Sequence, residues 1–146
     1  MSTPLPARHE RLFDENDSPV PDEIGLLAHR IGAIALFALI AMQFIWHLAW
    51  LPPERVPVGI VLALMVIPLA VPAFFLLFGA KKALFWAGFI AMLHFCHGVM
   101  EAWSSSTALV PGLIEATLAA IVCCAAGWHG LARRVYWRKL VNQASE

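Results

Sequence analysis

Four long apolar runs leave this chain few folds to adopt. They cover residues 27–51, 56–79, 83–103 and 109–131. Each is close to the ~20 residues that an α-helix, rising about 1.5 Å per residue, needs to cross about 30 Å of hydrocarbon. A closed β-barrel also spans membranes, but its strands need an alternating period of two that these runs lack. We therefore expect an all-α integral membrane protein with four transmembrane helices.

The composition and the connectors agree with this expectation. Hydrophobic residues make up 60% of the chain and charged residues 14%, against roughly 45–50% and about 25% in soluble domains. Ten basic residues balance ten acidic ones, so no net charge favours a nucleic-acid partner, and we expect none. The connectors "PPER", "AKK" and "SSST" are short, which predicts that consecutive helices are antiparallel. The lipid bilayer is the first predicted partner.

The charges predict the domain organisation and the orientation. We expect a flexible acidic cytoplasmic tail over residues 1–25, the four-helix transmembrane domain over 26–135 and a second cytoplasmic tail over 136–146. Nine basic residues flank one end of the helices, whereas only Arg55 lies at the other, so both termini are predicted to be cytoplasmic. Tryptophans would anchor the two interfaces, the outer one by Trp46, Trp50 and Trp103 and the inner one by Trp86, Trp128 and Trp137.

The third apolar run contains the stretch "MLHFCHGVMEAW", in which three ionisable residues interrupt a membrane span. At 100° per residue, His94, His97 and Glu101 share one helix face with small residues such as Gly98. Bulky residues, among them Phe89, occupy the other face. A small and polar face opposite a bulky one is typical of a helix that packs on protein with one side and meets lipid with the other. These side chains are therefore predicted to point into the bundle.

The first and fourth runs carry polar residues that could meet this face. Glu115 shares its face with small residues, and Glu115 and His97 both lie six residues, or ~9 Å, from the outer ends of their helices. Gln43 and His47 share a stripe on the first helix. The sequence thus predicts a polar intramembrane site in the outer half of the bundle, composed of His97, Glu101, Glu115, His94, His47 and Gln43.

Several kinds of site could use these groups. The first is an interhelical clamp that fixes packing, and the second is a proton, ligand or metal site, for which intramembrane ionisable residues are the usual sign. Metal ligands would come from His47, His97, Glu101 and Glu115. A haem could take two axial histidines, His47 with His97 or His94. No cofactor is assigned.

Motifs for catalysis are not evident. The sequence has no HExxH motif and no nucleophile-elbow pattern, so no catalytic residue is predicted and the balance favours a protein that is not an enzyme. A membrane enzyme acting on lipid or quinone is the third alternative. The three cysteines fall within apolar runs without Cys-x-x-Cys spacing and are expected to be small buried hydrophobes.

The segments "FCHGVMEAW", "WHLAWLPP" and "LIEATLA" resemble an uncharacterised bacterial inner-membrane family, domain of unknown function 2069. The resemblance covers about residues 26–135, and its strongest part is the His-Gly-x-x-Glu core of His97, Gly98 and Glu101. It implies a small four-helix protein of the bacterial inner membrane. It brings no activity, cofactor or catalytic residue.

Two functions follow from these patterns. The first is a non-enzymatic accessory or binding subunit that docks with itself, as a homo-oligomer, or with the subunits of a larger membrane complex. Small size, short loops and small-residue helix faces favour it. The alternative is an oligomeric proton, metal or small-solute transporter or sensor that uses the intramembrane His/Glu cluster.

Overall fold

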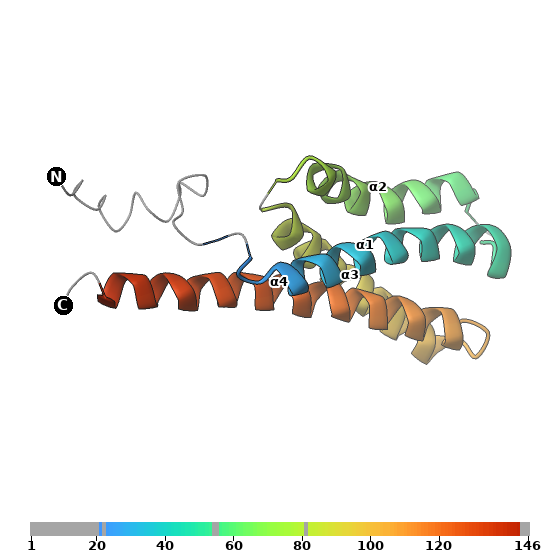
Figure 1. Cartoon of the computed structure of the whole chain (residues 1–146). Helices are drawn as coiled ribbons and strands as arrows, with labels where there is room; N and C mark the ends of the chain where they lie inside the picture. Colours follow the sequence, from blue (N-terminus) through green and yellow to red (C-terminus); the bar gives the residue numbers. More distant parts are fainter. Residues whose placement is uncertain (1–20, 22, 54–55, 81, 144–146) are drawn as a thin grey trace.

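The structure, a computed structural model, describes residues 21, 23–53, 56–80 and 82–143 (Figure 1). The first helix comprises α1 (Leu26–Ile45) and the π-helical turn η2 (Trp46–Trp50), and is followed by α2 (Val58–Leu77), α3 (Ala83–Ser104) and α4 (Leu109–Gln143). All four helices are long and apolar enough to cross a membrane, and the described residues contain no strand. The predicted all-α fold with four transmembrane helices is confirmed.

Local sequence explains where α2 ends. Gly79 adopts a φ of 76°, a left-handed conformation that costs glycine little. The amide of Gly79 donates to the Leu76 carbonyl at 3.1 Å, and the amide of Ala80 donates to the Phe75 carbonyl at 3.0 Å. These two bonds form a Schellman cap, which satisfies carbonyls at the helix end and reverses the chain. α3 therefore begins within a few residues and runs antiparallel to α2.

The helices are unequally buried. In Figure 1, α1, α3 and α4 lie together, while α2 lies on the side away from α4. Within its membrane-spanning window α2 is 22% buried, whereas the other three helices are 39–44% buried. The core between the helices combines large side chains from α1 and α2 with small ones from α3 and α4: Leu36, Leu39, Leu69, Ala87, Ala91, Ala119 and Val122. Alanine on α3 and α4 allows those two helices to approach closely.

α4 continues well past the membrane-spanning region. It contains 35 residues, so it is about 52 Å long and exceeds the hydrocarbon thickness by roughly 20 Å. The segment predicted as a tail after residue 135 is helical over its described part, 136–143. Most of the predicted tail at residues 1–25 lies outside the described residues. At the same end of the bundle, His129 Nδ1 lies 3.2 Å from the Gly25 carbonyl and joins α4 to the start of α1.

Candidate functional site in the transmembrane bundle

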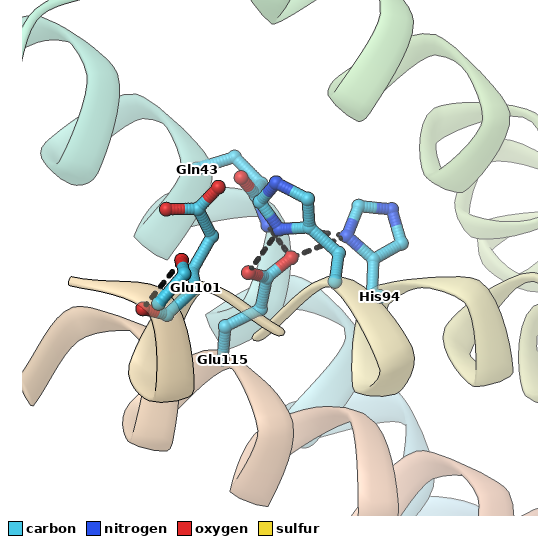
Figure 2. Close-up of polar contacts among 6 residues, drawn as sticks. Gln43, His94, Glu101 and Glu115 are labelled. Carbon is cyan, nitrogen blue, oxygen red and sulfur yellow. Dashed lines mark hydrogen bonds and ion pairs between the residues drawn. The ribbon is translucent and has the colours of Figure 1, made fainter. Parts of the chain in front are cut away.

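Glu115 on α4 is the centre of the site. Its side chain is fully buried, and Gln43 Nε2 on α1 donates a hydrogen bond of 2.6 Å to its Oε1 atom. His94 Nδ1 lies 2.7 Å from the same oxygen, and His97 Nδ1, also on α3, lies 2.8 Å from Oε2. Figure 2 shows these contacts converging on one carboxylate. A single side chain therefore connects three helices.

The chemistry of this centre follows from the carboxylate. An ionised carboxylate only accepts hydrogen bonds, so both imidazole rings carry a proton on Nδ1 when Glu115 is ionised. Burying a charge is costly unless it is paired and hydrogen-bonded. Three donors on two oxygens offset that cost, since hydrogen bonds to charged groups are roughly twice as strong as neutral ones. The centre can thus hold an ionised Glu115 beside two neutral histidines, or an ionised Glu115 beside a histidine that has gained a proton.

A pair of glycines allows α3 and α4 to come close enough for these bonds. A Cβ atom added to Gly98 would lie 2.6 Å from the Gly112 carbonyl oxygen, and one added to Gly112 would lie 2.6 Å from the Gly98 carbonyl oxygen. Because Cβ atoms essentially never approach other atoms that closely, only glycine fits at both positions. Gly98 follows His97 directly, and Gly112 precedes Glu115 by three residues. The glycine contact therefore sets the distance across which the histidines of α3 bond to Glu115.

The π-helical turn at the end of α1 contains two more aromatic side chains of the site. The Leu51 amide donates to the Trp46 carbonyl at 2.8 Å, five residues back, as a π-helix requires. The Trp46 and His47 rings stack with centroids 5.4 Å apart and an interplanar angle of 14°. Trp46 also contacts the His97 ring at 5.7 Å. π-turns of this kind are frequent at functional sites.

The expectation that Trp46 anchors the outer interface is wrong. Its side chain is only 2% exposed, whereas Trp50 and Trp103 are 45% and 92% exposed. The reason is its place on the first helix: Trp46 follows the buried Leu36, Leu39 and Gln43 at the three- and four-residue spacing of one helix face, so it points into the bundle. Trp46 thus covers the site, and the other two tryptophans remain on the surface.

Two buried atoms of the site lack a hydrogen-bond partner among the described residues. They are Gln43 Oε1 and His47 Nε2. Gln43 is fully buried and His47 is 7% exposed. His47 does not contact Glu115 directly, although it lies within electrostatic range of His97, Glu115 and Glu101. Since buried polar groups are normally paired, these two atoms have unused hydrogen-bonding capacity.

Glu101 does not join the contacts that converge on Glu115. Its side chain is half-buried, and its backbone carbonyl accepts bonds from the Ser105 amide and the Ser104 hydroxyl. Figure 2 shows its carboxylate beside the cluster, away from those contacts. His97 could have paired with Glu101 one helical turn away, but its Nδ1 contacts Glu115 on the neighbouring helix instead. Hydrogen bonds therefore join four of the six predicted residues through Glu115, and Glu101 and His47 lie outside this set.

A metal site is one of the alternatives that the sequence leaves open, with His47, His97, Glu101 and Glu115 as candidate ligands. In the part of the chain that the structure describes, no group of three or more His, Cys, Asp or Glu side chains could hold a metal ion. The two ring nitrogens nearest to Glu115 face its oxygens as hydrogen-bonding partners, rather than surrounding a common point.

The cysteines also differ from expectation, since Cys96 and Cys124 are exposed, while the half-buried Cys123 donates to the Gly88 carbonyl at 3.3 Å.

These features define the chain as a four-span helical membrane protein with a hydrogen-bonded His/Glu/Gln centre. Residues 31–133, more than half of the 146, match a family described as "Predicted membrane protein (DUF2069)". The chain therefore belongs to the DUF2069 family, as the sequence segments indicated. The comparisons with curated proteins and with solved structures gave no significant match.

Proposed function

We propose that this protein is a non-enzymatic accessory subunit of the bacterial inner membrane that docks a transmembrane helix, either of a second copy or of a larger complex. The supporting observation is a groove of about 660 Å³ between α1 and α4, lined in part by Ala28, Thr117, Ala120 and Cys124. Small side chains on a lipid-facing surface allow another helix backbone to approach closely, and such packing drives helix association in membranes.

The polar centre supports this role as a clamp. Its bonds from Gln43, His94 and His97 to Glu115 tie α1, α3 and α4 together and so fix the relative positions of the two helices that line the groove. Both carboxylate oxygens are engaged within the protein. A rigid docking surface loses little conformational freedom on binding, which favours affinity.

Cys124 provides a direct test of the groove. It is exposed and lines the groove, whereas Cys96 is exposed on α3. We expect mild oxidation of native membranes to cross-link Cys124 and to leave Cys96 uncross-linked. A homodimer would identify a second copy, and a stoichiometric product with another subunit would identify a larger complex. Cross-links at Cys96 as efficient as those at Cys124 would contradict the proposal.

Filling the groove tests the same proposal independently. Ala120→Phe places a ring in the groove and should weaken association at least about tenfold, corresponding to about 1.4 kcal/mol, because the partner helix can no longer approach closely. Cys96→Phe is the matched control on α3 and should leave association unchanged. The measurement is the fraction of the protein that co-purifies with its partner in mild detergent at native expression. A solitary monomer in the parent protein would refute the docking function.

The proposed orientation places both termini in the cytoplasm. It is supported by the basic residues near the Gly25 end of the bundle, among them Arg30, Lys82, Arg134 and Lys139. We expect green fluorescent protein fused after residue 146 to fluoresce and alkaline phosphatase at the same position to be inactive. Alkaline phosphatase inserted in the 105–108 connector should be active. The reverse pattern would place the Glu115 centre near the cytoplasmic face.

A further inference from the structure

The polar side chains of the centre become more exposed toward one end of the bundle. Side-chain exposure decreases from 24% for His97 to 5% for His94 and 0% for Glu115. Glu101, one turn beyond His97, is half-buried. His97 and Glu101 lie toward the end of the bundle formed by η2 and the 105–108 connector, which we call the η2 end. A polar path therefore leads from that end to the Glu115 carboxylate.

The opposite direction is closed by an apolar layer. Below the centre lie buried residues of all four helices, including Leu36, Leu39, Leu69, Ala91 and Ala119. Residues 31–42, 58–77, 83–93 and 116–128 contain no His, Lys, Arg, Asp or Glu. The next imidazole pair, His29 and His129, lies at the Gly25 end with ring centroids 5.2 Å apart. Because proton transfer needs a chain of polar groups, this layer separates the two histidine groups.

We propose that the centre of His97, Glu115 and His94 is a proton-binding site that exchanges with the aqueous phase at the η2 end alone. A proton arriving at the ring of His97 makes it cationic, and the Glu115 carboxylate balances that charge through Oε2, which accepts the Nδ1–H bond. The proton leaves by the same route. The added proton binds His97 Nε2, the ring nitrogen that does not contact Glu115, while Nδ1–H keeps its bond to Oε2. This arrangement suits sensing rather than transport across a single protomer.

The groups that face this site come from three helices. α1 contributes His47 and the neutral Gln43, α3 contributes His94, His97 and Glu101, and α4 contributes Glu115. The described residues of α2 include no titratable side chain. His47, which keeps an unpartnered Nε2, shares its electrostatic environment with the site. A proton added to His97 is therefore felt by His47 and by the indole that stacks on it.

Trp46 makes the proposal measurable. Its ring stacks on His47 and contacts His97, and a cationic imidazole beside an indole quenches its fluorescence. The experiment compares the parent protein with Trp46→Phe in phosphatidylcholine vesicles, so that the difference reports Trp46. We expect acidification at the η2 end to reduce this difference signal. His97→Gln should remove the response, and Cys96→Ser, at an exposed position of α3, should preserve it.

The sidedness of the site is tested with the same signal. Vesicles of known protein orientation are given an acid step on one side, with and without a protonophore. An immediate response to the η2 side, and a response to the other side only with the protonophore, would support the proposal. Three results would overturn it: a pH-independent Trp46 signal, a response that survives His97→Gln, or an equal response to both sides. These measurements need no partner, so the docking function can fail while this proposal stands, and the reverse.

Discussion

Glu115→Ala is expected to lower the free energy of unfolding by about 2–4 kcal/mol, the largest effect of any single substitution in the polar centre. The alanine leaves the buried Gln43 Nε2 and His94 Nδ1, and the partly buried His97 Nδ1, without their common acceptor. Interhelical hydrogen bonds in membranes contribute on average ~0.6 and at most about 1.7 kcal/mol each, and an unpaired buried group adds to that loss. Unfolding by SDS in mixed micelles measures the change.

Two variants make this result specific to the hydrogen bonds. Glu115→Gln keeps an acceptor oxygen and the shape of the side chain, so it should cost only about 1 kcal/mol. Glu101→Gln is the matched control, because the Glu101 carboxylate makes no hydrogen bond within the described part of the chain and should change stability by less than about 0.5 kcal/mol. If Glu115→Ala is no more destabilising than Glu101→Gln, the centre does not clamp the bundle.

Gly98→Ala and Gly112→Ala should each destabilise the protein by about 1–3 kcal/mol, the usual cost of overpacking a tight contact. An added Cβ at either position would meet a carbonyl oxygen at 2.6 Å, whereas ordinary contacts begin at 3.4 Å. The helices must therefore separate by about 0.8 Å, which lengthens the contacts of His94 and His97 with Glu115. The effect should consequently be smaller in a Glu115→Gln background, where there is less pairing left to lose.

α4 also contains two glycines at which a substitution by alanine should not destabilise the protein. A Cβ added to Gly127 or Gly130 meets nothing within 4 Å. Gly127→Ala and Gly130→Ala should therefore leave stability unchanged or raise it by up to about 1 kcal/mol, because alanine favours the helix over glycine. Similar losses at all four positions would mean that the substitutions act through the helix backbone and not through the contact between α3 and α4.

The fold was predictable because hydrocarbon restricts the chain so strongly. Length, apolarity and short connectors were sufficient to place four helices, and the division of α3 into small and bulky faces predicted its buried side. Ala87, Ala91 and Gly98 are buried as expected, while Phe89 and Met92 are exposed. Each of these inferences depends on the regular 3.6-residue period, which holds along the whole of α3.

The candidate site was predictable only where regular helix geometry determines which residues meet. Equal depth in antiparallel helices brings Glu115 beside His97, and that argument needs only a constant rise per residue. The burial of Trp46 follows from its place on the helix face of Leu39 and Gln43, which the interpretation of the tryptophans as interface anchors did not take into account. His97 could pair with Glu101 or with Glu115. Which of them it contacts depends on the distance between α3 and α4, and that distance is set by the Gly98–Gly112 contact in the structure.

The length of α4 has a mechanical consequence. The helix is continuous from Leu109 to Gln143, so Glu115 and the far end belong to one rigid rod. About 42 Å of rod separates Glu115 from Gln143 at 1.5 Å per residue. A tilt of about 10° around the Glu115 contacts would therefore displace that end by about 7 Å, an amplification that follows from the lever length alone. A small change in the contacts of Glu115 would therefore become a large displacement of the α4 end on the other side of the membrane.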